Sequence, residues 1–171
     1  QTQWFQTRAR VHSVANHVKI SDKYRVYADL VNFTLNYTPY TKEMIDNHDR
    51  VMMMGHGCPT GLFSINRFKN SQGLIIDFST VPLLQEKKDN VFIWCNADQF
   101  VARHELSGFS SGMFISEVGE ANAMRVYGTD QDIVDESNYG FARILNKYLD
   151  HDTKDIYENV MKEYGLIAED N

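Results

Sequence analysis

Two side chains in this sequence have the types needed for nucleophilic catalysis, and they stand at comparable points along the chain. Cys95 closes the apolar run Val91–Cys95, and His56 follows the apolar run Val51–Met54. A thiol attacks a carbonyl group as its thiolate, and an imidazole within reach of a hydrogen bond or one water can take its proton. The two residues need not be close in sequence, provided that the fold brings both into one cleft.

Glycines on both sides of His56 add to this interpretation. Gly57 leaves a backbone N–H accessible, which is what an oxyanion donor requires, and the pair Gly55 and Gly57 lets a substrate backbone approach closely. Plainer interpretations stay open for each residue. A cysteine that ends an apolar strand is most often a small core residue, and a histidine between glycines is most often part of a turn.

Composition and charge exclude several classes of protein. The 171 residues are 43% apolar and 23% charged, which is typical of a single globular domain. The net charge is −6, and no basic cluster is longer than Lys87-Lys88, so nucleic acid and anionic membrane surfaces are not expected partners. No apolar run approaches the ~18–20 residues that span a bilayer.

Only two cysteines occur, Cys58 and Cys95, so the chain is not a disulfide scaffold and suits a reducing compartment. No signal-peptide pattern opens the chain, and we expect a cytoplasmic protein. Because the first residue is Gln1 rather than Met, a removed leader stays open. Neither a metal-ligand spacing nor a glycine-rich phosphate loop is present, so we expect no metal and no cofactor.

The order of expected elements indicates an α/β fold. Residues 8–14 could form a strand, residues 24–37 mix helix and strand spacing, and a short helix is expected over 42–47. Clearer signals follow: strands over 51–54, 74–76 and 91–95, a hairpin over 58–65, a helix over 79–88, a long loop over 96–112, a helix over 113–124, a strand over 125–129, and helices over 135–149 and 153–164, the last capped by Gly165.

His56 and Cys95 both follow strands in this scheme. The active sites of such sheets form at the carboxyl ends of the strands, and neighbouring strands lie ~4.8 Å apart. The sequence therefore predicts that an imidazole and a thiol face one cleft.

This combination resembles the caspase-like cysteine peptidases, which also include metacaspases, legumain, clostripain, gingipains, separase and CHAT domains. Their pattern is an apolar strand ending in His-Gly, a small hairpin, a helix, and a second apolar strand ending at the nucleophilic cysteine. Here it is matched by Val51-Met52-Met53-Met54-Gly55-His56-Gly57, by Gly61-Leu62-Phe63, by the helix from Val81 to Lys88, and by Val91-Phe92-Ile93-Trp94-Cys95. The resemblance covers roughly residues 45–150, including a Gly-Phe-Ser-Ser-Gly-Met segment at 108–113 that is similar to the end of a CHAT-type domain.

The resemblance implies a caspase-like three-layer sandwich, with a mostly parallel sheet and helices on both faces, formed by residues 1–171 as a single domain. It implies a cysteine endopeptidase that cuts a protein or peptide substrate after a particular P1 side chain. Cys95 would be the nucleophile, His56 the general base and Gly57 the oxyanion donor. Asp98 and Glu117 could line a pocket for a basic P1 residue, although either could equally be a surface carboxylate. Arg103, in the expected loop, would then be a site of self-cleavage or an ordinary exposed arginine.

One departure from the family pattern leaves alternatives open. Family members usually have an acidic or small residue just before the nucleophile, whereas Trp94 precedes Cys95 here. If the alignment slides by two residues, the nucleophile position falls on Ala97, and the chain would be either a catalytically inactive relative that binds a partner or a deliberately mutated chain. Cys58 is a weaker candidate nucleophile. An unrelated α/β domain, such as a flavodoxin-like ligand binder, is a third hypothesis, but residues 1–40 contain no phosphate-binding loop.

Overall fold

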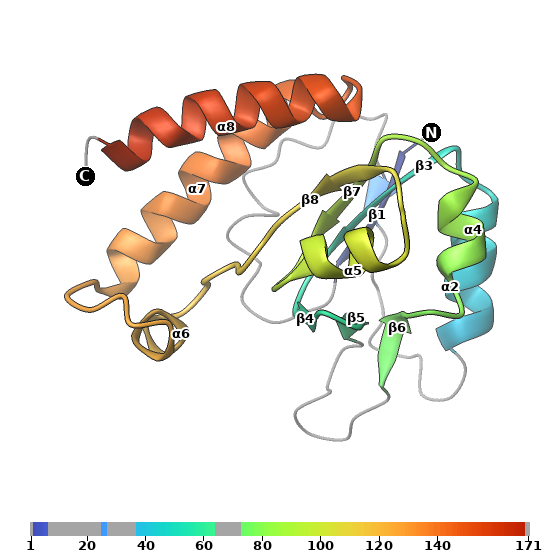
Figure 1. Ribbon diagram of the computed structural model, residues 1–171, viewed down its shortest axis with the longest axis horizontal. Helices are drawn as coiled ribbons and strands as arrows, with labels where there is room; N and C mark the ends of the chain where they lie inside the picture. The colour runs from blue at the N-terminus through green and yellow to red at the C-terminus, as the bar shows by residue number, and fades with distance from the viewer. Residues whose placement is uncertain (1, 7–24, 27–36, 64–72, 170–171) are drawn as a thin grey trace. The chain divides into compact units, whose positions relative to one another are not determined.

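The computed structural model describes residues 2–6, 25–26, 37–63 and 73–169 (Figure 1). The strand expected over 8–14 and most of the segment 24–37 lie outside these residues. The chain groups into two compact units, one made of residues 1–9 and 20–114 and the other of residues 10–19 and 115–171. The single domain expected over residues 1–171 stays a prediction.

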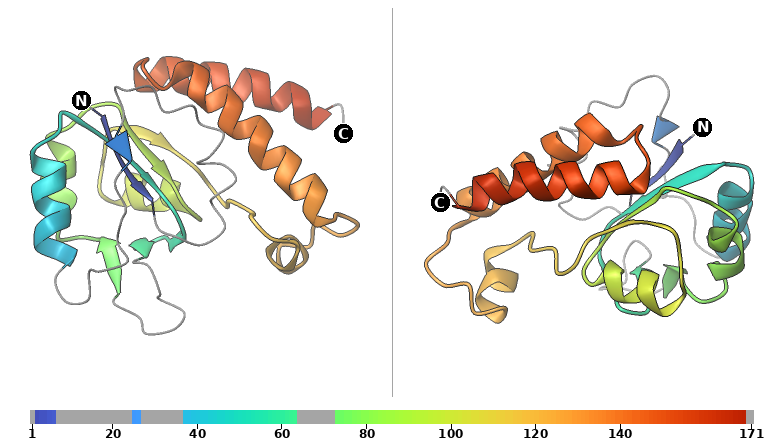
Figure 2. Two further views of the ribbon diagram at one scale, coloured as in Figure 1. Left: turned by 180° about the vertical axis from the view of Figure 1, so that it is seen from behind. Right: turned by 45° about the horizontal axis from the view of Figure 1, so that its top comes forward.

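A five-stranded parallel sheet forms the centre of the first unit. Its strand order is β2 (Arg25–Val26), β1 (Thr2–Gln6), β3 (Arg50–Met54), β7 (Asn90–Ile93) and β8 (Gly108–Ser110), and every neighbouring pair is parallel. The two central strands for which burial is described, β3 and β7, are apolar on both faces, as is typical of buried parallel strands. The expected α/β class and the strands near 51–54 and 91–95 are therefore confirmed (Figures 1 and 2).

A second, antiparallel sheet follows directly after β3. It consists of β4 (Gly57–Cys58), β5 (Gly61–Phe63) and β6 (Leu74–Ile76), in that order. The expected hairpin and the expected extended segment are both present, although residues 64 and 65 lie outside the described part. Gly61 has a φ of 146°, and a Cβ there would lie 1.9 Å from the carbonyl oxygen of Ile76. Only glycine fits where the two strands approach so closely.

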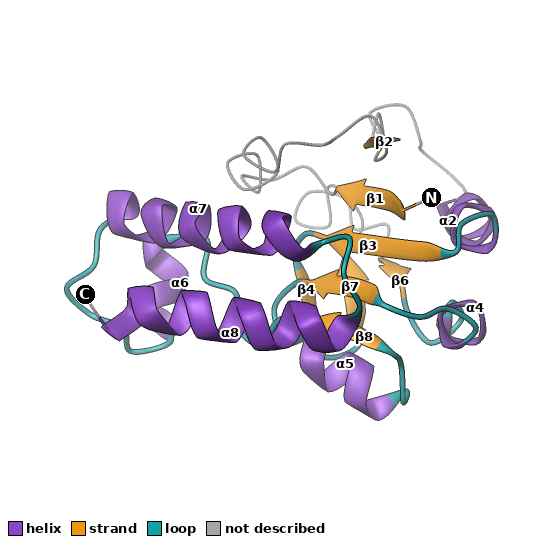
Figure 3. Ribbon diagram, turned by 90° about the horizontal axis from the view of Figure 1, so that it is seen from above, coloured by secondary structure: helices purple, strands orange, loops and turns teal. Residues whose placement is uncertain are grey.

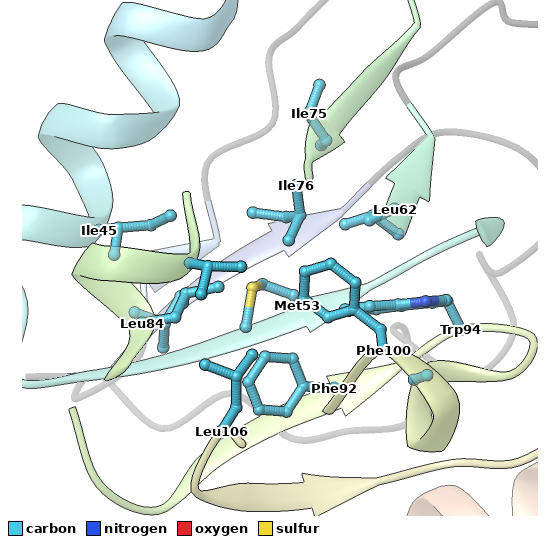
Figure 4. Packing of buried hydrophobic residues seen from close by; sticks show 13 residues of the cluster. Ile45, Met53, Leu62, Ile75, Ile76, Leu84, Phe92, Trp94, Phe100 and Leu106 are labelled. Carbon is cyan, nitrogen blue, oxygen red and sulfur yellow. The ribbon is translucent and has the colours of Figure 1, made fainter. Parts of the chain in front are cut away.

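Three helices pack on one face of the parallel sheet. They are α2 (Tyr37–Asp46), α4 (Val81–Gln85), which has a proline in its first turn, and α5 (Ala97–Arg103). Their apolar side chains join those of β3, β5, β6 and β7 in one buried cluster, the core cluster (Figure 4). Because all three helices share this cluster, helices on both faces are not established for the described part of this unit. The core cluster contains Ile45, Val51, Met53, Leu62, Ile75, Ile76, Val81, Leu84, Phe92, Trp94, Ala97, Phe100 and Leu106.

The second unit contains three helices among its described residues. The short helix α6 (Val118–Ala123) precedes α7 (Gln131–Tyr148) and α8 (Thr153–Glu169), which pack against each other as a hairpin (Figure 3). Asp130 caps α7 by accepting a hydrogen bond from the N–H of Ile133 at 2.9 Å. Among the described helices, none combines the length and apolar character needed to cross a bilayer.

Several expected elements after residue 95 are wrong. The long loop over 96–112 contains α5 and β8, because Ala97 and Phe100 are buried on one side of a short helix and Phe109 is buried in a three-residue strand. No strand forms over 125–129, where Val126 and Tyr127 are exposed. The remaining differences concern boundaries: α2 and α7 begin before the expected residues 42 and 135, α6 is shorter than 113–124, and Gly165 lies inside α8 rather than capping it.

Candidate functional site

His56 and Cys95 lie at equivalent positions beyond two neighbouring strands. Met54 pairs in register with Ile93 as the last such pair of β3 and β7, and each candidate residue follows two positions later. The N–H of Gly55 still donates to the carbonyl of Ile93 at 3.0 Å, so the two segments stay hydrogen-bonded for one residue beyond the paired strands. The sheet therefore brings both residues to the carboxyl edge of the same strand pair, as expected for an α/β site.

The alternation of side chains along β3 and β7 shows which residues of each strand face the core cluster. On β3, Met53 belongs to the core cluster, so Met54 faces the opposite side. On β7, Phe92 belongs to the core cluster, so the next residue faces the opposite side as well. Successive side chains in a strand point to opposite faces. His56 and Cys95 lie in bends and turns beyond these strand ends, so a common side for the two side chains, away from the core cluster, stays a prediction.

Cys95 occupies a tight turn between a strand and a helix. The N–H of Ala97 donates to the carbonyl of Trp94 at 3.1 Å, which closes a β-turn with Cys95 and Asn96 at its centre. Asn96 adopts a left-handed conformation, with φ of 63°, which asparagine tolerates better than most residues. The half-buried Cys95 thiol donates a hydrogen bond to the carbonyl of Phe114 at 3.2 Å.

Trp94 gives Gly57 a structural role that sequence analysis missed. The Trp94 side chain is fully buried, and its Nε1 donates to the carbonyl of Cys58 at 3.2 Å. A Cβ at Gly57 would lie 2.3 Å from Trp94 Cδ1 and 2.7 Å from the carbonyl oxygen of Gly61. The indole therefore fills the space that a side chain at position 57 would need, and packing requires glycine there.

The orientation of the Gly57 amide follows from the hairpin. Phe63 donates its N–H to the carbonyl of His56 at 2.8 Å, and the next pair along is Gly57 with Leu62. Hydrogen-bonded and non-hydrogen-bonded pairs alternate in an antiparallel ladder, so the Gly57 N–H points away from β5. Since β4 is an edge strand of its sheet, this N–H faces outward, as an oxyanion donor must.

Asp98 and Glu117 lie in different units. Asp98 is exposed in the first turn of α5, and its N–H donates to the carbonyl of Ser111 at 3.0 Å. Glu117 is half-buried at the N-terminus of α6. Their shared role in binding a basic side chain stays a prediction.

The other candidates of the sequence analysis have separate surroundings. Ala97 is fully buried in the core cluster, so a nucleophile at that position would face the interior, which favours Cys95 over position 97 as the candidate nucleophile. The Sγ of Cys58 lies 3.0 Å from Thr60 Oγ1. Arg103 ends α5 rather than lying in a loop, and its Nη1 donates to the carbonyl of Pro59 at 3.5 Å.

Ser111 is a residue near the site that sequence analysis did not single out. Its hydroxyl bonds to both main-chain groups of Trp94, accepting from the N–H at 3.1 Å and donating to the carbonyl at 2.9 Å. The only sequence signal was the Ser-Ser-Gly stretch itself, which is equally typical of any polar loop.

No group of three or more His, Cys, Asp or Glu side chains that could hold a metal ion occurs among the residues that the structure describes. A scan against models of protein families, a search of curated proteins and a search of solved structures each found no match.

Proposed function

We propose that this protein is a cysteine endopeptidase of the caspase-like type, with Cys95 as nucleophile and His56 as its general base. One observation carries the proposal. Met54 and Ile93 are register partners on adjacent parallel strands, and His56 and Cys95 each follow two residues later, at the carboxyl edge of this strand pair. An imidazole and a thiol at one sheet edge are the minimum that nucleophilic acyl transfer requires.

The reaction would proceed through an acyl-enzyme. His56 takes the thiol proton, and the sulfur of Cys95 attacks the carbonyl carbon of the scissile peptide bond. The tetrahedral intermediate collapses, the C–N bond breaks, and the imidazolium returns the proton to the leaving amine. Water, deprotonated by the same imidazole, then attacks the thioester, which releases the carboxylic acid product and restores the thiol.

The Gly57 N–H is the proposed oxyanion donor. It lies one residue beyond His56 and points outward from the edge strand β4, as the hairpin register requires. A backbone donor fixed in a hairpin costs no reorganisation when charge develops on the substrate oxygen. Packing against Trp94 holds this backbone in place, so the bulky residue that departs from the family pattern supports the proposed donor.

The thiol must leave its hydrogen bond before it can react. Cys95 donates to the carbonyl of Phe114, which keeps the proton on sulfur. We infer that rotation of the Cys95 side chain exchanges this carbonyl for the imidazole of His56. The same hydrogen bond is the observation that favours the second candidate, a caspase-like domain that has lost catalysis and binds a partner.

A caspase-like sandwich fold is part of the same proposal. The β3–hairpin–α4–β7 succession follows the order of elements in the caspase-like pattern, and we propose that the parallel sheet is the central layer of a caspase-like sandwich. The substrate is then a protein or peptide segment, and the exposed carboxylate of Asp98 would favour a basic P1 side chain by charge complementarity.

A positional library of fluorogenic peptides tests the function. We expect cleavage after lysine or arginine, and a loss of about 10²-fold or more in kcat/KM for both Cys95→Ala and His56→Ala, because a positioned base contributes about 10²–10⁴-fold. Cys58→Ala is the matched control, since its half-buried thiol lies in the neighbouring hairpin, and it should retain wild-type turnover.

Two results would overturn the proposal. Equal turnover by the wild-type chain and Cys95→Ala would show that the thiol is not the nucleophile. Absence of cleavage across the whole library, in a chain that unfolds cooperatively on heating, would favour the binding domain instead.

A further inference from the structure

The turn that contains Cys95 is hydrogen-bonded to one side chain from the segment after β8. Beyond Ile93 the chain leaves the ladder, and β8 ends at Ser110. The Ser111 hydroxyl accepts from the N–H of Trp94 at 3.1 Å and donates to the carbonyl of Trp94 at 2.9 Å. That carbonyl belongs to the peptide group that joins Trp94 to Cys95, so the hydroxyl restrains the backbone immediately before the cysteine.

Main-chain bonds hold the rest of the turn against the same segment. The N–H of Asn96 donates to the carbonyl of Gly112 at 2.9 Å, and the N–H of Asp98 donates to the carbonyl of Ser111 at 3.0 Å. The N–H of Ser111 in turn donates to the carbonyl of Phe92 at 3.0 Å. In this set only the two bonds to Trp94 depend on a side chain, and they alone can be removed by substitution.

We propose that Ser111 is a positioning residue for the nucleophile. The proposal rests on the proposed function, because it assumes that Cys95 reacts with the help of His56. Without the hydroxyl, the N–H of Trp94 loses its acceptor and the carbonyl loses one of its donors, so the turn shifts toward other partners. A displacement of about 1 Å at a reacting group can cost about 10²-fold in rate. Ser111 therefore sets the distance between sulfur and imidazole without touching substrate.

The test compares two adjacent serines in the full chain. Ser111→Ala removes the bonds to Trp94, Ser111→Thr keeps a hydroxyl, and Ser110→Ala is the matched control on β8, where Ser110 is equally half-buried. The rate of alkylation of Cys95 by iodoacetamide is measured against pH, with the modified peptide quantified by mass spectrometry. Thermal unfolding is recorded for every variant, and His56→Ala supplies the reference for an uncoupled thiol.

We expect Ser111→Ala to slow alkylation at pH 6.5 by about tenfold and to move its pH midpoint toward that of His56→Ala. Ser111→Thr and Ser110→Ala should keep the wild-type midpoint. A wild-type profile for Ser111→Ala would overturn the positioning role alone, whereas coincident profiles for the wild type and His56→Ala would overturn the proposed function. Loss of folding by Ser111→Ala would also count against positioning, since the hydroxyl would then serve stability.

Discussion

Two regions of this molecule are each stabilised by a different kind of interaction. The turn at Cys95 is held by main-chain groups and one hydroxyl, none of which titrates in the ordinary range. The hairpin of α7 and α8 is tied at its surface by ionisable side chains. Glu163 of α8 accepts hydrogen bonds from Lys147 and from the Tyr148 hydroxyl of α7.

Uncharged contacts also join α7 and α8. Ser137 and Tyr164 are hydrogen-bonded at 2.7 Å, and the ring of Tyr164 meets Phe141 edge to face. Exposed ion pairs contribute little and are screened by salt, whereas hydrogen bonds between uncharged main-chain groups have no titrating partner and depend little on salt. We therefore expect the site to keep its geometry over conditions that loosen the hairpin.

The largest expected effect comes from the small sheet that supports Gly57. Gly61→Ala combines a φ of 146° with a Cβ 1.9 Å from the carbonyl oxygen of Ile76, so both strain and overlap oppose it. We expect a loss of about 3–5 kcal/mol in the free energy of unfolding, measured with urea. Gly112→Ala is the control, because a Cβ there meets nothing within 4 Å; equal losses for both variants would refute the packing argument.

A smaller effect is expected from the buried amide at the opposite end of β7. Asn90 is fully buried, and its Oδ1 accepts the N–H of Val51 at 3.0 Å, while its Nδ2 donates to the carbonyls of Leu84 and Ser107. Asn90→Ala removes the acceptor of the Val51 N–H and a donor to the two carbonyls, so we expect a loss of about 1–3 kcal/mol in urea unfolding. The loss should be the same in low and high salt, and a strong salt dependence would contradict the comparison.

The smallest effect is expected in the helical hairpin and should depend on pH. Hydrogen bonds from Lys147 and Tyr148 lower the pKa of Glu163 below its ordinary 4.5, and the same partnership raises the pKa values of Lys147 and Tyr148 above 10.5 and 10.0. A depressed carboxyl pKa stabilises the fold above the unfolded value, and this contribution is lost as pH falls through the folded value. Lys147 and Tyr148, whose pKa values are raised, stabilise the fold below their unfolded pKa values. This contribution is lost as pH rises through the folded values.

Glu163→Gln should therefore lower the melting temperature slightly at pH 7, with the difference shrinking below pH 4.5 and in 1 M salt. Glu158→Gln is the matched control on the same helix, since Glu158 forms a long, exposed ion pair with Lys154 at 3.8 Å within α8 itself. A difference between wild type and Glu163→Gln that persists unchanged at acid pH would show that the carboxylate charge is not what ties the helices.

Sequence reasoning succeeded where short apolar runs end at glycine or at a turn. The runs at 51–54 and 91–93 and the Pro59-Thr60 turn carry strong local signals, and the register of β3 and β7 then brings His56 and Cys95 to one edge. It failed over 96–112, because α5 has only seven residues and β8 buries one large side chain, Phe109. Elements this short have little periodicity of their own and form only against the core.

The surroundings of the site were harder to predict than its two central residues. The bonds that Ser111 makes to Trp94 join a side chain to main-chain groups 17 positions away, and no residue pattern records such a bond. The packing of Trp94 over Gly57 is likewise visible only once the hairpin and β7 lie side by side. Sequence therefore proposes the two candidate residues, whereas the contacts around them are seen only in the fold.

The central claim is that the imidazole of His56 activates the thiol of Cys95. An ordinary thiol, with a pKa near 8.5, is only about 1% thiolate at pH 6.5, so activation is easily detected there. The rate of Cys95 alkylation by iodoacetamide at pH 6.5 should fall by about tenfold or more in His56→Ala and stay unchanged in His48→Ala, whose ring is bonded to the carbonyl of Met44 instead. Equal rates in the wild type and His56→Ala would contradict the account.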